Sequence, residues 1–132
     1  MGEPPADLYS AMEQEEPSFA DVLLTYIDQS SYTKDSDVYK KAGLSKAAFS
    51  KIRGGHLPKR ENVLRLALVL LLSIDETKIL LHAAGYDFQP NNKFDRFICF
   101  FLEEHTKGRD YDYDLLNLWC YDLTGIALVG DK

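Results

Sequence analysis

The stretch from Gly43 to Gly55, GLSKAAFSKIRGG, decides the fold of this chain. Gly43 can adopt the left-handed backbone conformation that ends a helix tightly, and Ser45 can accept hydrogen bonds from the free N–H groups that open the next helix. In that second helix Phe49 and Ile52 stand three residues apart, so both should point inward. The pattern therefore predicts two short helices joined by a tight turn.

The outward face of the second helix is small and basic. Four residues are predicted to lie on it: Lys46, Ala47, Ser50 and Lys51. A tight turn followed by such a helix is typical of a helix-turn-helix, whose second helix enters the major groove of DNA, so we interpret these four as base-facing. Flanking residues are candidates for phosphate contacts, which position a protein without reading sequence. These candidates are Lys34, Arg53, His56, Lys59 and Arg60.

Charge is unevenly distributed along the chain. The net charge is −6, yet residues 34–65 carry nine Lys and Arg against three acids, a local charge of +6. Residues 1–33 contain seven acids and no Lys or Arg. An acidic protein is a poor general binder of polyanions, but one basic face is sufficient for a nucleic-acid site. A solvated, lysine-rich surface would give the same pattern.

Length and composition favour one folded domain. A chain of 132 residues with 45% hydrophobic and 12% aromatic residues can bury a substantial core. The longest apolar stretch, residues 63–72, is too short to span a bilayer, and no secretory signal is visible. Cys99 and Cys120 lie in predicted helices without a CxxC motif, which favours free, buried thiols. We therefore expect a cytoplasmic protein that does not bind a membrane.

The periodicity of the chain predicts an all-α fold. Residues 1–17, with three prolines and a cluster of acids, are predicted to form a flexible acidic leader. Apolar spacing and caps then predict seven helices, at about 19–29, 34–42, 45–53, 60–72, 74–84, 93–105 and 113–121. The apolar helix at 60–72 should be buried at the centre. Residues 18–86 would form a helix-turn-helix domain, and residues 87–132 a helical extension packed on it, with an apolar tail that packs back or stays extended.

Residues 19–85 resemble the phage-repressor-like helix-turn-helix family, of the xenobiotic-response-element type. The string GLSKAAFSKIRGGHLPKRENVLRLALVLLLSIDE carries the likeness, through its Gly-apolar-Ser turn, Phe49 and Ile52, and then Gly55 and Pro58. The resemblance implies a five-helix, lambda-repressor-like bundle, here with two further C-terminal helices, in a transcriptional regulator of bacteria or phage that binds double-stranded DNA, often as a dimer. From Tyr86 onward the chain is similar to modules at the C-terminal end of larger bacterial proteins, macrodomain-containing ones among them.

Several positions depart from the family pattern. Asp35 and Asp37 open the second helix, where they would repel an approaching phosphate. Lys46 replaces a frequent Gln, which favours a phosphate or a guanine edge over adenine. Tyr39 stands where the family has a small residue, so it should swing outward or widen the crossing of the two helices. Arg53 replaces a frequent Glu and favours a polyanion.

No residue pattern predicts catalysis or a cofactor. Residues 110–114 place acids at the first, third and fifth positions of a calcium loop, but Leu115 and Tyr121 stand where that loop needs Gly and Glu. Helix capping by Asp112 or Asp114 explains the segment better. The three histidines are scattered, and the sequence has no nucleophile elbow, Walker loop or dinucleotide motif. We therefore predict no enzymatic activity, metal or cofactor.

Aromatic residues recur at helical spacing in the two C-terminal helices. Most are expected in the core, but two short helices cannot bury all of them. Phe100, off the main apolar face, and Trp119 are the candidates for a dimer or partner surface. They support a second hypothesis, in which the helix-turn-helix is a repurposed scaffold for a non-enzymatic protein-interaction or dimerisation module.

Overall fold

The computed structural model describes residues 2–129, which form eight α-helices and no β-strand. In chain order the helices are α1 (Ala6–Glu13), α2 (Phe19–Gln29), α3 (Asp35–Lys41), α4 (Lys46–Arg53), α5 (Arg60–Leu70), α6 (Ile74–Ala83), α7 (Lys93–Thr106) and α8 (Tyr113–Thr124). The all-α class is therefore confirmed. Residue 1 of the predicted leader and residues 130–132 of the predicted extension lie outside the described residues.

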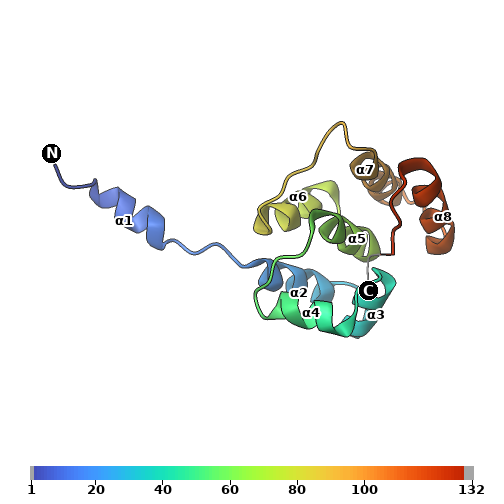
Figure 1. The fold of residues 1–132 in the computed structure, drawn as a ribbon, viewed down its shortest axis with the longest axis horizontal. Helices are drawn as coiled ribbons and strands as arrows, with labels where there is room; N and C mark the ends of the chain where they lie inside the picture. The colour runs from blue at the N-terminus through green and yellow to red at the C-terminus, as the bar shows by residue number, and fades with distance from the viewer. Residues whose placement is uncertain (1, 130–132) are drawn as a thin grey trace.

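The helix count differs from the predicted one because the leader contains α1. None of the seven predicted helices covers residues 6–13, which are helical in the structure, and the flexibility of the leader stays a prediction. Most of their side chains, such as those of Leu8, Met12 and Glu13, belong to good helix formers. Every residue of α1 is exposed. In Figure 1 this helix projects away from the remaining helices.

The apolar helix α5 lies at the centre of the bundle, as predicted. It packs against α3, α6 and α7 (Figure 1). Seven of its eleven residues are buried: Val63, Leu64, Leu66, Ala67, Leu68, Val69 and Leu70. Such a helix, apolar on nearly every side, can be accommodated only where neighbours surround it. It therefore forms the common core of the N-terminal and C-terminal parts.

The helix α5 ends two residues earlier than the predicted helix at 60–72. α5 ends at Leu70 because Leu71 adopts the left-handed conformation, with φ 53° and ψ 47°. This conformation costs a non-glycine residue about 1 kcal/mol or more. It allows Leu72 to be buried and Ser73 to begin α6 with the predicted capping box, in which Ser73 and Glu76 each accept the other's backbone N–H.

The C-terminal helices and the tail pack onto the bundle through contacts with α5, α7 and α8. α7 packs on α5 and α6, and α8 packs on α7. The guanidinium of Arg65 donates two hydrogen bonds to the carbonyl oxygen of Ala127, at 3.0 and 2.8 Å. The side-chain oxygen of Asn117 accepts from the N–H of Leu128 at 2.9 Å, and Leu128 is fully buried. Of the two outcomes expected for the tail, residues 126–129 thus pack back.

None of the helices among residues 2–129 is both long and apolar enough to cross a membrane.

Candidate functional site

The turn between α3 and α4 has the local geometry that the sequence predicts. Gly43 has a positive φ of 77°, which L side chains rarely adopt. Its N–H donates to the carbonyl of Lys40 at 2.9 Å, and the N–H of Leu44 donates to that of Tyr39 at 2.8 Å. The hydroxyl of Ser45 then accepts from the N–H of Ala48 at 3.0 Å. These bonds satisfy two carbonyls at the end of α3 and one N–H at the start of α4, so the turn positions α4 directly after α3.

The inward face of α4 packs on α3 through aromatic contact. Phe49 and Ile52 are buried, as predicted. The ring of Tyr39 lies 4.9 Å from that of Phe49, centroid to centroid, with 31° between the ring planes. Tyr39 is only 8% exposed, so the expectation that it swings outward is wrong. Its ring packs inward on Phe49 instead, with the two ring planes tilted.

The outward face of α4 is open to solvent. Lys46, Ala47, Ser50 and Lys51 are all exposed, in a structure that includes the leader and both C-terminal helices. A shallow groove of about 340 Å³ lies beside them, between α3 and α4. Its lining residues are Asp35, Ser36, Tyr39, Lys46, Phe49, Ser50 and Arg53. The face is therefore accessible, with small side chains between two lysines.

The residues predicted to contact phosphates divide into two groups. Lys34, Arg53, His56 and Lys59 are exposed around the two ends of α3 and α4. Arg53 also approaches Asp35, with 3.7 Å between guanidinium nitrogen and carboxylate oxygen, and both side chains are substantially exposed. An exposed pair at that distance contributes little and can be exchanged for another anion.

Arg60 does not belong with this group. Its guanidinium forms a bidentate pair with the carboxylate of Asp95, at 2.6 and 2.7 Å. These hydrogen bonds raise the pKa of Arg60 above its usual value. Asp95 accepts a third hydrogen bond from the N–H of Gln89, at 2.7 Å. The prediction of a phosphate contact is therefore corrected, because Arg60 is engaged inside the junction between α5 and α7.

The two candidates for a partner surface lie beside one groove. Phe100 on α7 is 55% exposed, and Trp119 on α8 is partly buried, with its ring stacked 6.2 Å from that of Phe101. The groove has a volume of about 380 Å³. It is lined by Lys93, Arg96, Phe97, Phe100, Phe101, Trp119, Leu123 and Thr124. Sequence reasoning missed Leu123, although its spacing of four residues from Trp119 places both on one side of α8.

The acidic segment before α8 has a structural role. The carboxylate of Asp112 accepts from the N–H groups of Asp114 and Leu115, so it caps α8, one of the two predicted caps. Asp110 hydrogen-bonds Nδ1 of His105. Both cysteines are free thiols, Cys120 buried and Cys99 half-buried. Burial, followed by the charges of Asp95 and Glu103, raises the pKa of Cys99 to about 11.

Comparison with known protein families, with curated proteins and with solved structures gave no match.

Proposed function

We propose that this chain is a DNA-binding module with a helix-turn-helix of the phage-repressor-like type, acting in a transcriptional regulator. The observation that carries the proposal is the exposed face of α4, where Ala47 and Ser50 lie between Lys46 and Lys51 behind a tight glycine turn. An eight-residue helix is about 12 Å long, and its small side chains allow close approach to the floor of the groove. The major groove of B-DNA, about 12 Å wide, admits an α-helix.

The two lysines would read base edges by donation. A lysine ammonium can donate to O6 and N7 of guanine, which are acceptors in the major groove. Four exposed side chains, those of Lys34, Arg53, His56 and Lys59, would contact the phosphate backbone on either side. Arg60 is left out because it is held by Asp95. The proposal thus rests on fewer cations than the sequence first indicated.

Fluorescence anisotropy of a labelled, mixed-sequence duplex tests this proposal. With about four phosphate contacts, the logarithm of the binding constant should fall against the logarithm of salt concentration with a slope of about −3 to −4. Lys34→Ala should reduce the steepness of that slope by about 0.9. Lys107→Ala is the matched control, since Lys107 is an exposed lysine at the C-terminal end of α7, beside Ser73 and Asp75. Absence of binding at low salt, or equal effects of the two variants, would contradict the proposal.

The groove between α7 and α8 favours a second candidate function, a protein-interaction module without catalytic activity. Phe100 and Leu123 are 55% and 68% exposed, an arrangement more common at interfaces than on free surfaces. If this is the function, the chain should not bind DNA, even at low salt. The chain should also form a homodimer or a complex with a protein partner, and Phe100→Ser should weaken that complex. Trp119→Ala is a less specific probe because Trp119 also packs on Phe101 inside the bundle.

A further inference from the structure

The helix α1 carries an apolar face that no other part of residues 2–129 buries. Leu8 and Met12, one turn apart, lie on the same side of the helix as Ala11. Leu8, Tyr9 and Met12 are 45%, 55% and 75% exposed. An isolated helix of eight residues is marginal in water, so α1 needs a surface on which to pack.

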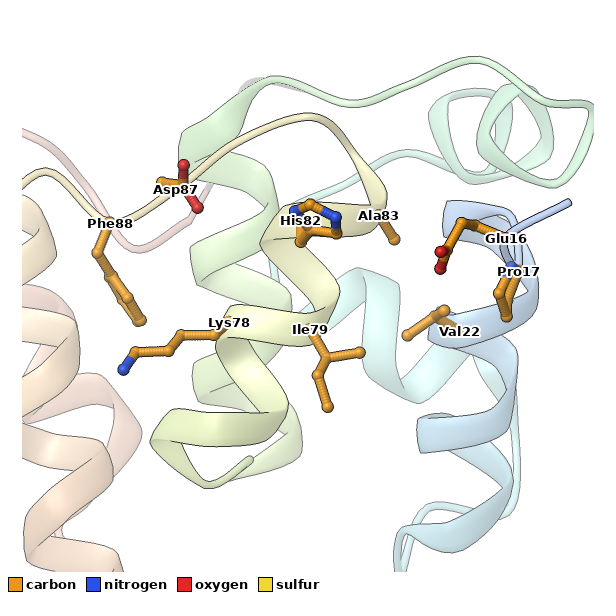
Figure 2. Close-up of a pocket in the computed structure, with 9 residues that line it drawn as sticks. All are labelled: Glu16, Pro17, Val22, Lys78, Ile79, His82, Ala83, Asp87 and Phe88. Carbon is orange, nitrogen blue, oxygen red and sulfur yellow. The ribbon is translucent and has the colours of Figure 1, made fainter. Parts of the chain in front are cut away.

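A groove of about 870 Å³ begins where the chain that bears α1 leaves the bundle. Glu16 and Pro17 form its edge, Val22 lies on α2, and Ile79 and Ala83 come from α6. Figure 2 shows Ile79 and Ala83 on the side of α6 that faces Val22 and Pro17, whereas Lys78 extends toward Phe88. Ile79 is 54% exposed. The apolar residues of the groove are therefore accessible to a helix laid along α6.

The groove matches α1 through its apolar side chains, whereas its charged side chains are of both signs. Lys78 and His82 lie along the exposed face of α6, and the groove's own acids are Glu16 and Asp87. α1 carries Asp7 and Glu13 on its polar face and has no basic residue. An amphipathic helix in such a groove would bury Leu8 and Met12 against Ile79, Ala83 and Val22.

The connection between α1 and α2 decides which molecule supplies the helix. Gln14 and Ser18 are extended, with ψ values of 122° and 161°. Pro17 favours an extended conformation of Glu16 before it, and no glycine occurs in residues 14–18 to reverse the chain. The segment carries α1 away from the bundle (Figure 1). A return onto its own groove would need a sharp reversal that these residues oppose.

We propose that α1 docks in the α2–α6 groove of a second copy of this chain, so that two molecules exchange their N-terminal helices. Because each helix departs from the edge of the groove it would fill in its partner, a reciprocal exchange closes a two-fold dimer. The proposal does not depend on DNA binding.

Sedimentation velocity of the full chain between about 1 and 300 µM tests the exchange, with a reversible dimer as the expected result. The double variant Leu8→Asp, Met12→Asp and the single variant Ile79→Asp should each raise the dimer dissociation constant by about 100-fold or more. None of these residues is buried in the monomer, so the fold of helices α2 to α8 should not change. Ser10→Asp is the matched control, since it adds a charge to the polar face of α1.

A mixture of the two disrupted variants distinguishes exchange from other contacts. The Ile79→Asp chain keeps an intact α1, and the Leu8→Asp, Met12→Asp chain keeps an intact groove. Their mixture should form a heterodimer in which one of the two helix–groove contacts is intact. This heterodimer should have a lower dissociation constant than the homodimer of either variant. A monomer at every concentration overturns the proposal. Hydrogen exchange then distinguishes two cases: protected amides in residues 6–13 mean that α1 packs on its own groove, and exposed amides mean that it binds a different partner. A dimer that depends on Phe100 and not on Leu8 also overturns it.

Discussion

The α3–α4 surface and the junction between α5 and α7 each contain an arginine–aspartate pair, built in opposite ways. At the junction, Arg60 and Asp95 meet through two hydrogen bonds, with side chains 10% and 3% exposed. On the surface, Arg53 and Asp35 approach within 3.7 Å, with side chains 58% and 37% exposed. Both arginines belong to the same positive block of sequence, seven residues apart.

Because the two pairs differ in burial, Arg60 stabilises the fold whereas Arg53 is available for binding. Removing one member of a buried pair leaves an uncompensated charge away from water, which is strongly destabilising. An exposed pair contributes little to stability and is screened by salt, so its cation remains available to another anion. Positive charge in the sequence therefore measures a binding surface only after the buried cations have been subtracted.

Asp95→Ala should have the largest effect on stability. It leaves Arg60 buried without its carboxylate and removes the acceptor for the N–H of Gln89, so the free energy of unfolding should fall by about 3–5 kcal/mol. Urea denaturation followed by circular dichroism measures this change. Asp35→Ala, the matched control at the surface pair, should change it by less than about 1 kcal/mol. If the two substitutions lower the free energy of unfolding equally, the buried pair is no more important for stability than the exposed pair.

Cys99, one turn after Asp95 on α7, reports on the electrostatics of the junction. Because burial and the charges of Asp95 and Glu103 raise its pKa from 9.0 to about 11, the reactive thiolate should be about 100-fold scarcer at pH 7.5 than in the unfolded chain. The thiol is neutral in both states below pH 9, so the shift leaves the free energy of unfolding unchanged there and lowers it as pH rises from 9 toward 11. Alkylation rates in a Cys120→Ala background measure the thiolate directly. A plateau in rate below pH 10 would contradict the assignment.

Asp35→Asn tests the exposed pair of Arg53 and Asp35, and it should have the smallest effect of these substitutions. It removes an acid beside the α4 face and frees Arg53, so duplex DNA should bind about fivefold more tightly, the equivalent of roughly 1 kcal/mol between unit charges in water. Asp37→Asn removes the same charge without changing the ion pair of Arg53. The anisotropy difference between these two variants isolates the contribution of the pair, and a weaker complex with Asp35→Asn would count against the proposed surface.

Local patterns in the sequence predicted most of the helices and their caps. Ser45, Ser73 and Asp112 act as caps because a cap depends on residues only two or three positions away. The burial of Phe49 and Ile52 follows in the same way from helical spacing. The exposure of Lys46 and Lys51 was predicted, whereas a role for them in DNA binding stays a prediction.

Contacts between distant residues could not be predicted by the same reasoning. Asp95 stands 35 residues after Arg60, so nothing in the local sequence indicates that Arg60 is buried. Tyr39 could be placed inward only once the neighbouring ring of Phe49 was known. α1 was missed because prolines and acids around residues 6–13 resemble those of an unstructured leader, although the residues between them are good helix formers.

The hydrogen bonds between Arg65 and the C-terminal tail have a consequence for tolerance to mutation. Arg65 contacts the main-chain oxygen of Ala127, and Asn117 contacts the main-chain N–H of Leu128. Recognition of backbone atoms is indifferent to the side chain at position 127, so a saturation scan should find that position permissive and positions 65 and 117 restrictive. The part of this attachment that depends on Arg65 would then be encoded 62 residues before Ala127 in the sequence.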